Sequence, residues 1–213
     1  MAVAGNIIMT LFFFALAFFS GALPFSAWLA RGLAHVELRK VGDGNPGAAN
    51  AWKAGGWRVG ALALMLDYLK GAVPVAGAHF GFHLAGLALG AVAVAPILGH
   101  AFSPFLRFRG GKGLTVTFGA WSGLTLAQAP LVLGLFMALF YFVVAGEAWA
   151  VMFSLLGLLA HLLLQHADVA LLTAWAGNAA VLVWTHRREL QRRPGLKPLP
   201  FVSRTARAGE HQV

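Results

Sequence analysis

Glycines alternate with polar residues in the run Gly42-Asp43-Gly44-Asn45-Pro46-Gly47-Ala48-Ala49-Asn50. Glycine adopts positive φ at little steric cost, so neighbouring amide groups in such a run can converge on one point and hold an anion. If a helix begins just after Asn50, the amides of its first turn add to this field, and Lys53 lies on that turn. The run predicts a phosphate site, and a flexible turn between two helices is the alternative.

Three cations lie close together in a second glycine-containing run, from Gly99 to Gly113. Arg107, Arg109 and Lys112 stand at the head of a long apolar segment, and such a cluster binds phosphate or carboxylate strongly. The run is not the Gly-x-x-x-x-Gly-Lys-Ser/Thr loop of nucleotide-binding proteins. A positively charged stop signal with aromatic anchors is the alternative. That alternative does not explain why Gly110-Gly111-Lys112-Gly113 should open a helix, where glycine is unfavourable.

Two opposite charges, Asp67 and Lys70, lie about ten residues into an apolar segment. Their spacing of three residues allows a contact on one helix face. Unpaired, either charge would cost at least ~2.5–3.5 kcal/mol at the middle of a bilayer. We expect a structural ion pair, with a role for Asp67 in orienting a residue of the site as the alternative.

His186 ends the last apolar segment and is a candidate for proton transfer, because histidine titrates near neutral pH. An ordinary interface residue is the alternative. His79, His83, His161 and His166 form no ligand cluster in the sequence, so no metal site is predicted. The absence of cysteine excludes disulfides, thiolate zinc sites, iron–sulfur clusters and a thiol nucleophile.

The elements that must position these residues are membrane helices. Of the 213 residues, 59% are hydrophobic and only 11% are charged, and the mean hydropathy is +0.75. Soluble domains are about half apolar and roughly a quarter charged. A net charge of +9 in a soluble protein would suggest nucleic acid, but here the charges are confined to segments between apolar runs. We predict an all-α, polytopic integral membrane protein that binds anions and no nucleic acid, as one domain over residues 1–213.

A helix needs about 20 apolar residues to cross a bilayer. The predicted spans are Asn6–Ala30 with Pro24 near its inner end, Trp57–Ala76, Phe80–Ile97, and four short segments within Leu114–Trp184. The last four are separated by breaks at Gln128–Pro130, Gly146–Glu147 and Gln165–Asp168. These segments predict about seven transmembrane helices, with five spans and two long helices in the last region as the alternative.

Lys and Arg are distributed unequally between the connections. They fill the segments Arg31–Gly56 and Gly99–Gly113 and the tail from about residue 187, whereas the connections Gly77–Gly81, Gln128–Pro130 and Gln165–Asp168 contain none. Because cytoplasmic loops carry the excess of Lys and Arg, we predict an N terminus outside and a cytoplasmic C terminus.

Several of these segments, in this order, resemble the bacterial acyl-phosphate:glycerol-3-phosphate acyltransferase family. They are Leu23-Pro24-Phe25, Gly42–Asn50, Asp67-Tyr-Leu-Lys-Gly71, Gly99–Gly113 and His186, and the resemblance covers about residues 20–190. It implies an enzyme of the bacterial cytoplasmic (inner) membrane, with about seven spans and a cytoplasmic active site. The implied reaction transfers a fatty acyl group from acyl phosphate to the 1-hydroxyl of glycerol 3-phosphate, giving lysophosphatidate and phosphate, without metal or nucleotide cofactors.

The resemblance also implies roles for individual residues. His186, Lys112 and Asn50 match the catalytic positions. The substrate- and phosphate-binding positions are Gly42, Asp43, Gly44, Asn45, Gly47, Lys53, His100, Arg109, Gly110, Gly111, Gly113 and Glu189. The site should lie at the membrane surface, where the acyl chain can remain in the lipid bilayer.

Three of these positions depart from the family pattern, which has Ser, Arg and Asn where this chain has Asp43, Lys53 and Glu189. Asp43 and Glu189 each add a negative charge where a phosphate should approach. Asp43 could pair with Lys53 and turn away from the ligand, the acceptor could differ, or transfer could be lost. A lipid- or phosphate-binding membrane protein without catalysis, or a transporter, is therefore a further alternative.

Overall fold

The computed structural model describes residues 2–197, so the end of the basic tail, with Arg204 and Arg207, lies outside the described residues. The α-helices are α1 Ala2–Ala22, α2 Phe25–Ala34, α3 Ala48–Ala76, α4 Gly86–Ala101, α5 Leu114–Thr125, α6 Gln128–Val143, α7 Glu147–Leu164 and α8 Val169–His186. Short 3-10 turns η1 Leu38–Lys40 and η3 Pro104–Leu106 and a π-turn η2 Gly77–Gly81 interrupt the connections. Strands β1 Val144–Ala145 and β2 Gly195–Leu196 pair antiparallel.

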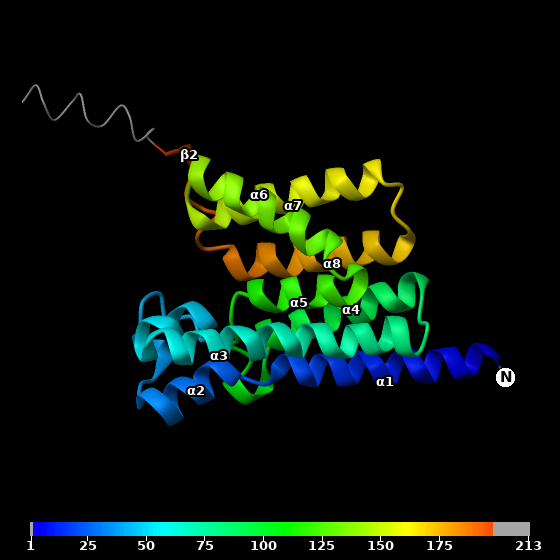
Figure 1. The fold of residues 1–213 in the computed structure, drawn as a ribbon, viewed down its shortest axis with the longest axis horizontal. Coiled ribbons are helices and arrows are strands. Elements are labelled where there is room, and N and C mark those ends of the chain that lie inside the picture. Colours follow the sequence, from blue (N-terminus) through cyan, green and yellow to red (C-terminus); the bar gives the residue numbers. More distant parts are fainter. Residues whose placement is uncertain (1, 198–213) are drawn as a thin grey trace, which may run out of the picture.

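The long helices run side by side, in alternating directions, along one common axis (Figure 1). Helix α4 packs against α1 and α8, α3 packs against α5, and α6 forms a hairpin with α7. The connections that carry Lys and Arg meet at the end of the bundle where α2 lies, and the chain begins at the opposite end (Figure 1). The fold therefore brings the two glycine-containing loops to the same end.

Five segments are long and apolar enough to cross a membrane. They are Asn6–Ala34, Ala48–Gly81, Gly86–Leu106, Glu147–Leu164 and Val169–His186. Helix α6 is apolar but has 16 residues, and α5 has 12 residues and is about 18 Å long, against about 30 Å for the hydrocarbon core. The breaks predicted between residues 114 and 184 are confirmed, because this region forms four helices rather than two long ones. The count of seven spans and the orientation of the termini stay predictions.

Two predicted boundaries are wrong for local reasons. The first segment is broken at Leu23–Pro24, so that α1 and α2 are separate helices. Helix α4 begins at Gly86 rather than Phe80, because the π-turn η2 includes Phe80 and Gly81 and residues 82–85 are not helical. Helix α3 begins at Ala48, but Gly56 has a non-helical backbone (φ 72°, ψ −172°), so a short helical segment precedes a kink. The predicted start of the second span at Trp57 coincides with this kink.

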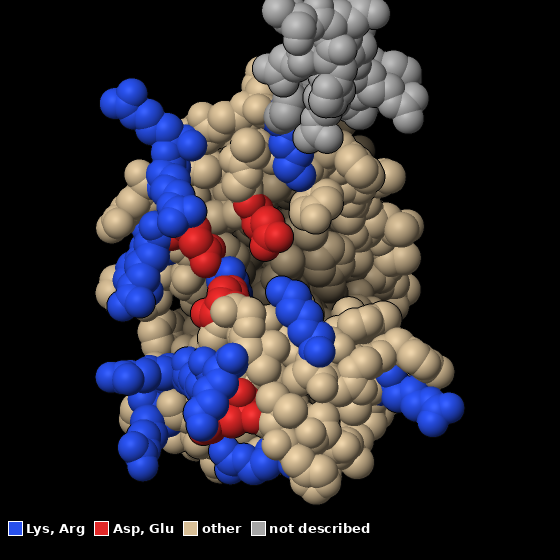
Figure 2. Space-filling view, turned by 90° about the vertical axis from the view of Figure 1, so that its left-hand side faces the viewer, with Lys and Arg blue, Asp and Glu red and all other residues tan. Residues whose placement is uncertain are grey.

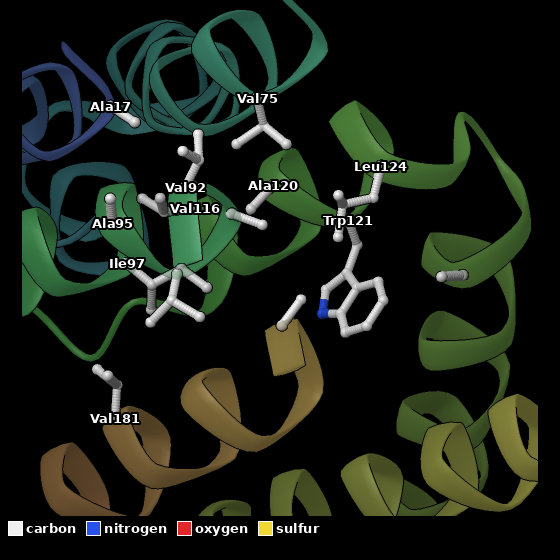
Figure 3. Packing of buried hydrophobic residues seen from close by; sticks show 14 of the residues in the cluster. Ala17, Val75, Val92, Ala95, Ile97, Val116, Ala120, Trp121, Leu124 and Val181 are labelled. Atoms are coloured by element: carbon white, nitrogen blue, oxygen red, sulfur yellow. The ribbon is translucent and has the colours of Figure 1, made fainter. Parts of the chain in front are cut away.

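The interior between α3, α4, α5 and α8 is filled by aliphatic side chains and one indole. Figure 3 shows Val92, Ile97 and Val116 in this cluster, with Trp121 facing α8. Trp121 Nε1 donates to Asn178 Oδ1 at 3.0 Å, and Asn178 Nδ2 donates to Thr117 Oγ1 at 3.0 Å. The buried polar groups are thus paired with one another, as low-dielectric surroundings require.

Glycines let the helices of this bundle approach closely, and this gives a first prediction. A Cβ added to Gly119 on α5 would lie 2.0 Å from the carbonyl oxygen of Tyr68 on α3. We expect Gly119→Ala to reduce the free energy of unfolding by about 1–3 kcal/mol, because the helices must separate. Gly32→Ala is the matched control, since a Cβ there meets no atom within 4 Å. The control should be neutral or stabilising by up to about 1 kcal/mol in thermal unfolding of the detergent-solubilised protein. Equal effects at both positions would contradict the close approach of α3 and α5.

Candidate active site

Lys and Arg gather on the end of the bundle that carries α2, with acidic side chains among them around a hollow in the surface (Figure 2). The elements at this end are the connection from α2 to α3, the connection from α4 to α5, and the segment that follows α8. These are the segments in which the sequence analysis placed the candidate site.

A buried ion pair holds the break between α1 and α2 against α3. Lys70 Nζ lies 2.6 Å from Asp67 Oδ1, and both side chains are only 2% exposed. Ser26 Oγ on α2 donates to Asp67 Oδ2 at 2.6 Å, and Lys70 Nζ donates to the carbonyl of Leu23 at 2.8 Å. The carbonyl that the break leaves without a helical partner is therefore bound by Lys70. The predicted pairing of Asp67 with Lys70 is present, and it fixes the position of α2.

The first loop folds around the buried Asn50 side chain. Asn50 lies in the first turn of α3, which begins at Ala48, earlier than the start after Asn50 that the sequence suggested. Its Nδ2 donates to the carbonyl of Asn45 at 2.9 Å and to Asp43 Oδ1 at 2.8 Å. Gly42 has φ 57°, and a Cβ there would lie 2.5 Å from Asn50 Oδ1. Glycine is needed at this position both for its backbone conformation and for the close contact.

The second loop folds back onto the end of α4. The amides of Gly110 and Gly111 donate to the carbonyls of Ala101 and His100 at 3.0 and 3.1 Å. A Cβ on Gly110 would lie 1.8 Å from the His100 carbonyl oxygen, and one on Gly111 would lie 2.3 Å from His100 Nε2. The glycines at the head of α5 therefore permit a close backbone contact, which a simple charged stop signal would not require.

Lys112 lies at the centre of the candidate site. Its Nζ is 2.8 Å from Asp43 Oδ2 on the first loop and 2.8 Å from Glu189 Oε1 beyond α8. Its carbonyl accepts a hydrogen bond from Thr185 Oγ1 at 3.0 Å. Three segments that are distant in the sequence are thus joined through one lysine.

The charges of this cluster stabilise one another. Burial alone would raise the pKa of Asp43, but hydrogen bonds from Lys112 and Asn50 outweigh it and lower the pKa to about 2. Burial alone would lower the pKa of Lys112, but the carboxylates of Asp43 and Glu189 outweigh it and raise that pKa. Asp43 is therefore ionised and Lys112 protonated at neutral pH.

His186 is buried at the end of α8, one residue after Thr185. Its Nδ1 lies 2.8 Å from the carbonyl oxygen of Leu182, which can only accept a hydrogen bond. The proton therefore belongs on Nδ1, and Nε2 of the neutral ring remains able to accept one. The backbone amide of Glu189 donates to the His186 carbonyl at 2.9 Å, so both side chains belong to one turn.

The segment after α8 is tied to the α6–α7 hairpin. Trp149 Nε1 donates to the carbonyl of Arg192 at 2.7 Å, and Gly195 and Leu196 pair with β1. Lys197 lies over the ring of Tyr141, 4.1 Å from its centroid. These contacts fix the turn that carries Glu189.

The structure brings together most residues that the sequence singled out, but the partner of Asp43 is a different lysine. The pairing of Asp43 with Lys53, one of three alternatives that the sequence left open, is not present among the described side chains, because Asp43 turns toward Lys112. Lys53 stays near the loop, with its Nζ 3.3 Å from where a Cβ on Gly42 would lie. Arg109 takes part through its carbonyl, which accepts a hydrogen bond from Arg39. Within residues 2–197, its guanidinium forms no ion pair.

Sequence reasoning missed Thr185, Ser26 and Arg39. Nothing in the local sequence distinguishes them, since each acts on a residue at least 41 positions away in the chain. Among residues 2–197, no three His, Asp or Glu side chains come together as ligands of a metal ion.

Known proteins match both the sequence and the fold. Residues 11–193 match the family profile described as glycerol-3-phosphate acyltransferase. The chain is 46% identical over 127 residues to glycerol-3-phosphate acyltransferase 1 of Thermotoga maritima, covering 59% of this chain and 62% of that relative. It is 36% identical over 182 residues to the glycerol-3-phosphate acyltransferase of Thermus thermophilus, covering 83% and 87%.

A solved structure has the same arrangement of helices. It is the glycerol 3-phosphate form of PlsY (YgiH), an integral membrane glycerol 3-phosphate acyltransferase, with a TM-score of 0.77 at 28% identity. The match covers 86% of this chain and 90% of that protein. The lysophosphatidic acid form of PlsY superposes with a TM-score of 0.74.

Proposed function

Because the chain belongs to the glycerol-3-phosphate acyltransferase family, we propose that it transfers a fatty acyl group from acyl phosphate to the sn-1 hydroxyl of glycerol 3-phosphate. The products are lysophosphatidate and inorganic phosphate. The observation that best supports this reaction is that Lys112 and the Gly42–Asn50 loop, with the Asn50 side chain, come together, since both substrates carry phosphate. Lysine, amide side chains and loop amides are donors suited to phosphate oxygens.

In the proposed reaction, the hydroxyl oxygen of glycerol 3-phosphate attacks the carbonyl carbon of the acyl phosphate. The new ester bond forms as the bond from that carbon to the phosphate oxygen breaks, and the hydroxyl proton passes to the leaving phosphate. Acyl phosphate is already activated, so positioning and charge stabilisation supply most of the acceleration. Lys112 stabilises the charge that grows on the leaving phosphate. Before the attack, His186 Nε2 accepts a hydrogen bond from the hydroxyl and orients it; the hydroxyl then releases this bond as its proton passes to the phosphate.

We place the site at the cytoplasmic face of the bacterial inner membrane, with the N terminus outside. The described Lys and Arg side chains at the α2 end of the bundle support this orientation, because cytoplasmic segments carry such an excess. The acyl chain then remains in the bilayer while the phosphates are bound at the surface.

Release of inorganic phosphate from palmitoyl phosphate by the purified protein tests the proposal. We expect release that requires glycerol 3-phosphate, with lysophosphatidate formed in equal amount. Absence of release above a protein-free control would contradict it.

A second candidate is the same transfer to an acceptor without phosphate. It is favoured by the two carboxylates on Lys112, which leave this cluster with a net negative charge. The same assay with glycerol in place of glycerol 3-phosphate distinguishes the two candidate functions. Faster release of inorganic phosphate with glycerol would favour the second candidate.

A further inference from the structure

The Asp43 carboxylate accepts hydrogen bonds from three groups of the candidate phosphate site. Its Oδ1 accepts from Asn50 Nδ2 at 2.8 Å and from the backbone amide of Asn45 at 3.2 Å. Its Oδ2 lies 2.8 Å from Lys112 Nζ. A loop amide, a side-chain amide and an ammonium group thus converge on one anion, which belongs to the chain itself.

The same three donors would serve a phosphate. Each is a donor that phosphate oxygens accept from, so a substrate phosphate must compete for them with the carboxylate. A phosphate beside the ionised carboxylate would also be repelled, since like charges about 4 Å apart disfavour one another even near the surface. The low pKa of Asp43, about 2, means that protonation does not remove this charge at neutral pH.

We propose that Asp43 is a resident anion in the phosphate site, which glycerol 3-phosphate must displace in order to bind. Asp43 thereby sets the affinity of the site for the acceptor. This inference rests on the proposed function, because it concerns the acceptor of that reaction. The half-exposed carboxylate can leave, since its side chain is 47% accessible and the loop on each side contains glycine.

Glu189 provides a matched contrast. It brings the same charge to Lys112 at the same distance, 2.8 Å, but no contact with Asn45 or Asn50 is present among the described side chains. Removing its charge changes the local field without freeing the donors of the first loop. If Asp43 weakens acceptor binding by occupying the donors of the first loop, then removing the charge of Asp43 must raise the affinity more than removing the charge of Glu189.

The experiment measures the dissociation constants of glycerol 3-phosphate and of inorganic phosphate by calorimetry, in the wild type and in Asp43→Ser, Asp43→Asn and Glu189→Gln. Asp43→Ser keeps a small polar group that can still accept from the Asn45 amide and preserve the turn. We expect it to bind both ligands about tenfold more tightly, since it frees charge-assisted donors. Asp43→Asn should show a smaller gain, and Glu189→Gln no more than about threefold, as for an exposed charge pair. The affinity for glycerol should not change.

Two results would overturn the inference. Weaker binding in Asp43→Ser would mean that the carboxylate supports the site or contacts the acceptor. An equal gain in affinity in Asp43→Ser and Glu189→Gln would mean that only the negative charge near Lys112 matters, and not the occupation of the donors. If Asp43→Ser does not fold, as judged by its thermal unfolding, Asp43→Asn keeps the shape of the side chain and must still bind more tightly. The affinities of the wild type and the three variants for phosphate could follow the expected order while the wild type shows no turnover. That result would refute the proposed function and leave this inference standing.

Discussion

Replacing Lys112 with alanine is expected to lower the kcat/KM of acyl transfer by about 100-fold or more. Lys112 is the cation on which both loops and the turn after α8 converge, and removal of one donor to a developing charge costs on the order of 10²–10³ in rate. The measurement is release of phosphate from palmitoyl phosphate in the presence of glycerol 3-phosphate. Lys112→Arg should recover only part of the activity, because the guanidinium is larger and planar.

Lys40→Ala is the matched control for this experiment. Lys40 lies in η1 at the same end of the bundle, is exposed, and pairs with Glu37 at 3.4 Å. Its removal takes away one positive charge without touching the candidate site, so activity should fall less than about twofold, as expected for an exposed pair. Equal losses in Lys112→Ala and Lys40→Ala would show that the total charge of this face matters rather than the position of Lys112.

Replacing Asp67 with alanine is expected to reduce the free energy of unfolding by about 3–5 kcal/mol, because the buried Lys70 ammonium would lose its counter-ion. Ser26 would lose its acceptor at the same time, so the break between α1 and α2 would loosen. Thermal unfolding in detergent measures the change. A double variant, Asp67→Leu with Lys70→Met, should recover much of the loss, since both buried charges are then removed together.

Glu37→Ala tests the same idea at the surface. Glu37 also pairs with cations, Arg31 at 4.0 Å and Lys40 at 3.4 Å, but these side chains are exposed. The expected effect is about 0–1 kcal/mol. If Asp67→Ala were no more destabilising than Glu37→Ala, the buried pair would not hold α2 in place.

The local sequence was sufficient to predict the class of protein and most boundaries of the helices. The four helices between residues 114 and 184 followed from short interruptions of apolar composition, which act over a few residues. The error at residues 80–85 arose where the π-turn η2 and the non-helical residues that follow it replace the first turns of the predicted helix.

The candidate site was predictable as a set of residues but not as a set of contacts. Glycine-rich runs, a lysine between glycines and a terminal histidine are visible in the sequence because the chemistry depends on residue type. The partner of Asp43 was not visible, because charge alone allowed Lys53 as readily as Lys112. The Asn50 side chain holds the loop in an orientation that directs Asp43 toward Lys112.

Composition, hydrophobic segments and the distribution of Lys and Arg by themselves determined that this is a helical membrane protein with one positively charged end, since these properties depend on transfer of each segment between water and lipid. Only the tertiary structure decided that Asp43 occupies the donors of the candidate phosphate site, that Glu189 joins it on Lys112, and that Lys70 binds the broken end of α1. The physical reason is that these contacts join residues far apart in the chain. Their distances depend on the close packing of α3 with α5 and of α4 with α1 and α8, and no local pattern records that packing.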